Sequence, residues 1–101
     1  MKKYEIFIGL KDQHTYEELI TADEFASILA TKCSRKKIGF SLVKQLGGYS
    51  HNLGYVTETS LCITLFGLDK DEVEKLGVEL KKIVNTDTIM ITSEECEYYY
   101  I

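Results

Sequence analysis

The chain has 101 residues, of which 45% are hydrophobic and 28% are charged, and its formal net charge is −4. This length allows one domain with a packed core and leaves no room for a second one. The basic cluster at residues 35–37 is short, so the acidic chain is not expected to bind nucleic acid. Without an apolar run of ~20 residues it is not expected to cross a membrane, and we predict a single cytoplasmic domain over residues 1–101.

The first half of the chain predicts a strand, a loop and a helix. Residues 3–10 alternate between large apolar and other side chains, as a strand with one buried face does. The polar residues 11–20 predict a loop. Thr21 and Glu24 then have the spacing of a capping box at a helix start. A stripe of apolar residues at helical spacing places this helix at about residues 22–33: Phe25, Ile28, Leu29 and Cys33.

The second half predicts two strands, a helix and a last strand. The strands are expected at residues 40–46 and at about 56–66, with Gly47 and Gly48 ending or bending the first, because glycine accepts positive φ and bulged backbone. Asp69 begins a second helix with capping-box spacing, and Asn85 is its expected C-terminal cap. Residues 88–92 predict the fourth strand.

The order β-α-β-β-α-β is that of an α+β, ferredoxin-like fold. Two split βαβ units then give a four-stranded antiparallel sheet with both helices on one face. The tail at residues 92–101 is expected to fold over part of the open sheet face or to add an edge strand.

The open face of this sheet is expected to be too apolar to remain in water as one patch. We therefore predict that two chains pack their sheets together as a homodimer. The residues expected at this interface are Phe7, Val43, Cys62, Phe66 and Met90.

The stretch from Gly48 to Glu58 is the candidate binding site, because it combines glycines, phenols, a histidine and a carboxylate. A solvated hairpin connection has much the same composition. Our first interpretation is a non-enzymatic, self-associating module that binds a small molecule or a protein partner there. The alternative is a small enzyme in which His51 and Glu58 act as an acid–base pair. The predicted ligand-binding residues are Tyr49, His51, Asn52, Tyr55 and Glu58.

No cofactor or metal is predicted. The three cysteines, Cys33, Cys62 and Cys96, lack the short spacing of a zinc or redox motif and are expected to be reduced thiols. His14 and His51 are far apart in the sequence, and no glycine-rich nucleotide-binding motif is present.

The segment GGYSHNLGYVTETSLCITLF at residues 47–66, followed by a helix and then by NTDTIMIT, resembles a family of small uncharacterised proteins known only as a domain of unknown function. The step from Val56 through Glu58 to Ser60 and the entry to the last strand at residues 85–89 carry this resemblance. It implies a ferredoxin-like fold and no established activity.

Overall fold

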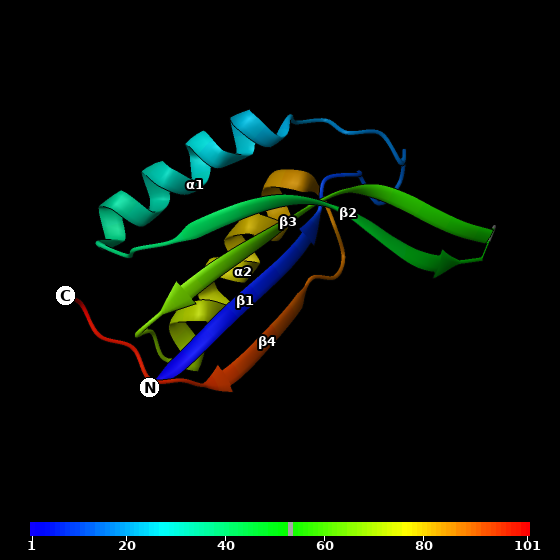
Figure 1. Ribbon diagram of the computed structural model, residues 1–101. Helices are drawn as coiled ribbons and strands as arrows, with labels where there is room; N and C mark the ends of the chain where they lie inside the picture. Colours follow the sequence, from blue (N-terminus) through cyan, green and yellow to red (C-terminus); the bar gives the residue numbers. More distant parts are fainter. Residues whose placement is uncertain (53) are drawn as a thin grey trace.

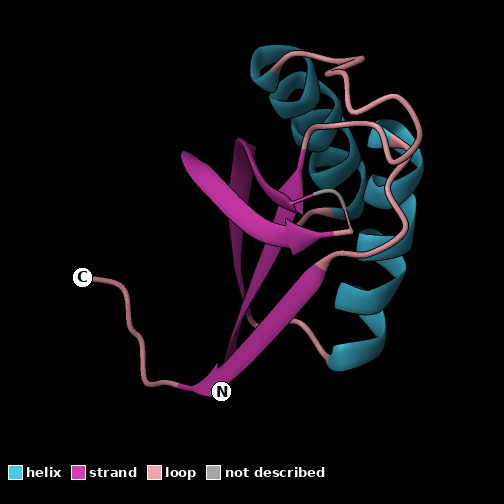
Figure 2. Ribbon diagram, turned by 90° about the vertical axis from the view of Figure 1, so that its right-hand side faces the viewer, coloured by secondary structure: helices cyan, strands magenta, loops and turns pink. Residues whose placement is uncertain are grey.

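The computed structural model describes residues 1–52 and 54–101, and of His51 it describes the backbone alone. All four strands belong to one antiparallel sheet in the order β2-β3-β1-β4, and both helices cover one face of it (Figures 1 and 2). The predicted ferredoxin-like fold is confirmed. The elements are β1 (Lys2–Gly9), α1 (Ala22–Lys36), β2 (Ser41–His51), β3 (Gly54–Phe66), α2 (Lys70–Val84) and β4 (Met90–Glu95).

Both helices begin with the predicted capping boxes. The Thr21 hydroxyl accepts a hydrogen bond from the Glu24 amide at 3.1 Å, and the Glu24 carboxylate accepts one from the Thr21 amide at 3.2 Å. Asp69 and Glu72 make the same reciprocal pair at the start of α2, at 2.8 and 3.2 Å. These bonds satisfy amides that have no partner within the helix. No helix among the described residues is long and apolar enough to span a membrane.

The helices end at residues with left-handed backbone. Asn85, with φ of 52°, caps α2 as predicted. The first helix runs three residues past the predicted end at Cys33, to Lys36, and ends at Lys37 with φ of 58°. Arg35 and Lys36 in the last turn favour this extension, because positive charge is stabilised at a helix C-terminus.

The core lies between the helices and the covered face of the sheet. Side chains that are 0–1% exposed come from β1 and the residue after it, from β3 and from both helices, as the alternating strand pattern and the helical stripes predict. The largest of them are Phe25, Ile6, Ile8, Leu10, Leu29, Leu61, Ile63, Leu65, Leu76 and Leu80.

The prediction that residues 48–58 form the connection of the hairpin is wrong for most of them, because they are paired in strands. β2 continues through Gly47 and Gly48, which pair with Glu58 and Thr57, so the glycines neither end the strand nor form a loop. A β-carbon at Gly47 would lie 2.9 Å from the Ser60 β-carbon, so the glycine makes room for its neighbour on β3. The resulting hairpin projects beyond the other strands (Figure 1). The last strand begins at Met90, two residues later than predicted.

The predicted apolar residues lie on the open face of the sheet. Val43, Phe66 and Met90 are 57%, 44% and 57% exposed. The C-terminal tail contacts this face at the end of β3, where the Tyr98 ring meets the Phe66 ring edge-on at 5.2 Å between centroids, and residues 99–101 are exposed. Residues 92–95 of the predicted tail belong to β4, which ends at Glu95. The described residues 96–101 form no further strand.

Candidate active site

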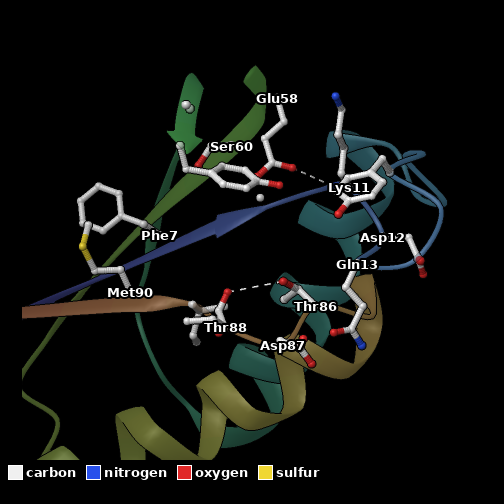
Figure 3. A pocket seen from close by; sticks show the side chains of 16 residues that line it. Phe7, Lys11, Asp12, Gln13, Glu58, Ser60, Thr86, Asp87, Thr88 and Met90 are labelled. Atoms are coloured by element: carbon white, nitrogen blue, oxygen red, sulfur yellow. Dashed lines mark hydrogen bonds between the residues drawn. The ribbon is translucent and has the colours of Figure 1, made fainter. Parts of the chain in front are cut away.

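A pocket of about 620 Å³ opens at one end of the uncovered sheet face (Figure 3). Its floor is formed by the end of β1 and the base of the β2–β3 hairpin. Two connections form its walls, the loop after β1 and the segment between α2 and β4. This volume lies in the range of small-molecule sites. The lining residues are Phe7, Gly9, Lys11, Asp12, Gln13, Tyr16, Gly47, Gly48, Tyr49, Glu58, Ser60, Thr86, Asp87, Thr88, Ile89 and Met90.

Glu58 places a carboxylate on the floor of the pocket. The side chain extends from β3 across β1 and lies directly over Gly9. Its Oε2 accepts a hydrogen bond of 3.1 Å from the Lys11 backbone amide (Figure 3). The Lys11 ammonium group donates to the Thr57 carbonyl at 3.0 Å, which fixes the adjacent backbone as well. A carboxylate held by an amide in this way is oriented before any ligand arrives.

Tyr49 lies beside Glu58 on the same face of the hairpin. Glu58 is directly opposite Gly47 in the strand register, and Tyr49 is two residues further along β2, so the two side chains are diagonal neighbours. Partial burial raises the pKa of the Tyr49 phenol, and the negative charge of Glu58 and the nearby Tyr16 raise it further. The hydroxyl therefore stays protonated at neutral pH and can donate a hydrogen bond.

Asp12 fastens the two walls of the pocket to each other. Its carboxylate accepts hydrogen bonds from the backbone amides of His14 and Thr15, at 2.8 and 3.0 Å, and from the Asn85 side-chain amide at 2.6 Å. The bond from Asn85, followed by those from the two backbone amides, lowers the pKa of Asp12 from 3.8 to about 2. The Gln13 amide also donates to the Asn85 carbonyl, at 3.1 Å. The loop after β1 is thus anchored to the end of α2.

The opposite end of the pocket is apolar. Phe7 and Met90 are paired across β1 and β4, and their side chains lie side by side (Figure 3). Ser60, between this end and Glu58, is 7% exposed and directs its hydroxyl to the Ile8 carbonyl at 3.4 Å. The pocket therefore offers a carboxylate and phenols at one end and an apolar surface at the other, which suits a positively charged organic molecule with an apolar part.

The structure brings together two of the five predicted ligand-binding residues, Tyr49 and Glu58. Tyr55 stands on the other face of the hairpin, three residues from Glu58 along β3, and its hydroxyl lies next to Gly48. Asn52 is exposed in the turn. The His51 side chain lies outside the described residues, so its predicted pairing with Glu58 stays a prediction.

Sequence reasoning missed most of the pocket wall. Lys11 contributes a backbone amide to Glu58, and residues 86–90 contribute a connection without periodicity, so neither has a distinctive side-chain pattern. Gly9 could have given a usable signal, because glycine near the end of a strand often marks a close approach, but we did not predict a role for it. No cluster of three or more potential metal ligands occurs among the residues that the structure describes.

No protein-family model and no curated protein matches the chain, so the resemblance to a family of unknown function stays a prediction. Solved structures similar to this chain include two forms of a phage enzyme. A phage SAM lyase in complex with S-methyl-5'-thioadenosine has a TM-score of 0.74 and 26% identity, over 93% of this chain and 80% of that one. A phage SAM lyase in the apo state has a TM-score of 0.70 and 24% identity, over 98% and 92% of the two chains, which supports the fold alone. Since the first of these, at 26% identity, is an enzyme, it favours the predicted alternative, a small enzyme, over a non-enzymatic module.

Proposed function

We propose that this protein is an S-adenosylmethionine lyase that releases S-methyl-5'-thioadenosine. The observation that carries the proposal is the structural similarity to the phage SAM lyase bound to that product, with a TM-score of 0.74 over 93% of the chain. The pocket supports it independently, because its carboxylate and apolar surface match a cationic substrate with a thioether product.

The reaction breaks the bond between the sulfonium sulfur and Cγ of the methionine part. The electron pair of that bond stays on sulfur, which becomes the neutral thioether of S-methyl-5'-thioadenosine. A lyase adds no water, and in this proposal the substrate's own carboxylate attacks Cγ and closes a ring. The second product is homoserine lactone with its ammonium group intact. No proton needs to be transferred to or from the protein.

Glu58 binds the substrate ammonium group in this proposal. A carboxylate next to the sulfonium would stabilise the substrate more than the transition state, because the sulfonium loses its charge as the bond breaks. The ammonium group keeps its charge throughout, so a contact there orients the four-carbon chain for ring closure without opposing the reaction. The hydrogen bond from Lys11 leaves Oε1 of Glu58 as the oxygen for this contact.

The remaining lining residues bind the nucleoside and the sulfur. The Tyr49 ring provides a face for the positively charged or planar parts of the substrate. Phe7 and Met90 provide an apolar surface for the methylthio group. An apolar environment at the sulfur favours the neutral product over the charged substrate, since a charge loses its hydration when water is excluded.

The test is incubation of the purified protein with S-adenosylmethionine, with both products quantified by liquid chromatography and mass spectrometry. We expect equal amounts of S-methyl-5'-thioadenosine and homoserine lactone, with no deuterium incorporated from D₂O at carbon. Calorimetric titration with S-methyl-5'-thioadenosine provides a readout of binding. Binding without turnover would return the protein to the non-enzymatic interpretation, and absence of both would contradict the proposal.

A further inference from the structure

We infer that Gly9 is a positioning residue for Glu58, because its missing side chain leaves the space in which the carboxylate rests. A β-carbon built at Gly9 would overlap the carboxylate carbon and both carboxylate oxygens of Glu58. The three atoms nearest to this missing β-carbon all belong to the Glu58 side chain. The strand position opposite Gly9 is held by Ser60, so Glu58 reaches it diagonally from the next row of β3.

The backbone conformation does not explain a glycine at position 9. Gly54 and Gly67 are the glycines with positive φ among the described residues, at 128° and 75°. Gly9 is the last residue of β1 and is paired with β3 as an ordinary strand residue. Alanine would be accepted there by the backbone and would stiffen the unfolded chain. The room needed by the Glu58 carboxylate is what requires a glycine.

The Glu58 carboxylate can hold this position only if residue 9 has no side chain. Oε2 reaches the Lys11 amide by crossing over Gly9, the last residue of β1 and two positions before Lys11 in the sequence. A methyl group at position 9 would lift the carboxylate away from β1 and break this bond. Because the carboxylate is the end of the flexible Glu58 side chain, it can move into the pocket or into solvent at little cost in free energy. The fold would survive while the geometry of the site changed.

The functional readout of this inference rests on the proposed function, so the experiment uses activity together with a structural signal. We compare Gly9→Ala, Glu58→Ala and the double variant, with Gly39→Ala as the matched control, since a β-carbon at Gly39 would meet no atom within 4 Å. We expect Gly9→Ala to melt at or above the wild-type temperature and to lose at least tenfold in kcat/KM. In the Glu58→Ala background the same change should alter kcat/KM by less than twofold.

The structural signal is the Lys11 backbone amide in NMR spectra. We expect its hydrogen exchange to be at least tenfold faster in Gly9→Ala and Glu58→Ala than in the wild type and in Gly39→Ala. Full activity with unchanged exchange in Gly9→Ala would overturn the inference, as would an equal loss of activity from Gly9→Ala in both backgrounds. If the wild type shows no lyase activity, the proposed function fails, while the exchange of the Lys11 amide still decides the role of Gly9.

Discussion

The backbone amide of Lys11 donates a hydrogen bond of 3.1 Å to the carboxylate of Glu58, 47 positions away along the chain. The contact joins the loop after β1 to the hairpin between β2 and β3 and places one charged group on the pocket floor. Since the Lys11 ammonium group also bonds the Thr57 carbonyl, one residue holds both the side chain of Glu58 and the backbone before it.

Replacement of Glu58 by Gln should reduce kcat/KM for S-adenosylmethionine by about 10- to 100-fold. Glutamine keeps the size of the side chain but removes the charge, and a hydrogen bond between charged groups contributes about 1.5–3 kcal/mol. Steady-state measurement of S-methyl-5'-thioadenosine release provides the test. The control is Glu74→Gln, which removes an exposed carboxylate on α2 that is 3.8 Å from Lys70. Equal activity of the two variants would rule out a role for the Glu58 charge.

Tyr49 should act through its ring more than through its acidity. Burial and the neighbouring Glu58 raise the pKa of the phenol above its ordinary value of 10.0, so it stays neutral throughout the physiological range. We expect Tyr49→Phe to bind S-methyl-5'-thioadenosine within threefold of the wild type and Tyr49→Ala to bind about tenfold more weakly, as for a lost stacking contact. Calorimetry on both variants distinguishes the ring from the hydroxyl. A loss of equal size in Tyr49→Phe would assign the role to the hydroxyl.

Acid should weaken the fold partly through Asp12. The pKa of its carboxyl is lowered from 3.8 to about 2 by its hydrogen bonds in the folded protein. The ionised group therefore stabilises the fold fully above pH 4, and this contribution is lost as the pH falls from about 4 to about 2. At pH 7, Asp12→Asn should lower Tm by several degrees, on the order of 5 °C. In thermal melts at pH 7, 4 and 2, the difference in Tm between Asp12→Asn and the wild type should shrink as the pH falls. Asp87→Asn, at an exposed position, is the control.

The fold was predictable from the sequence because its signals are local. Alternation in residues 3–10, the two capping boxes and the helical stripes each depend on neighbours within a few positions, and each is confirmed. The two strands of the hairpin were predicted, but their outer part was taken for a connection because Gly47 and Gly48 are commonly found in turns. In the structure they extend β2, because pairing with Glu58 and Thr57 stabilises an extended conformation, which glycine also accepts.

The pocket was harder to predict because it is assembled from distant residues. Tyr49 and Glu58 were found since a phenol and a carboxylate are visible as side chains. The contribution of Lys11 is a backbone amide, which no residue type indicates. That of Gly9 is an absence of atoms, and a glycine near a strand end indicates a close approach without saying which side chain makes it. Asp12 and Asn85 are 73 positions apart, and their bond follows from the tertiary structure alone.

Self-association through the open sheet face stays a prediction, and one substitution tests it. Val43 is 57% exposed on this face, whereas Val78 is 52% exposed on α2. A stable dimer buries about 800 Å² per partner, much of it apolar, so a carboxylate in its centre should disrupt it. We expect the wild type and Val78→Glu to be dimers at about 50 μM by light scattering, with Val43→Glu a monomer. A wild-type monomer would contradict the prediction.

The acid–base pairing of His51 with Glu58 is tested by His51→Ala. The ring closure in the proposed reaction needs no proton transfer, and Glu58 is held by Lys11. We therefore expect kcat to fall less than tenfold and its dependence on pH between 5 and 8 to be unchanged. A loss of about 100-fold or more, with a pH profile that flattens near the ordinary pKa of histidine, would show that His51 transfers a proton instead.

The bond between Asp12 and Asn85 also decides when the site comes into existence during synthesis. Gly9, Lys11 and Glu58 all leave the ribosome before the residues that complete the walls, since Asn85 anchors the loop after β1 and residues 86–90 close the other side. A nascent chain that ends before residue 85 has the carboxylate but no pocket around it. The pocket proposed to bind S-adenosylmethionine is therefore complete only in chains whose last strand has been made.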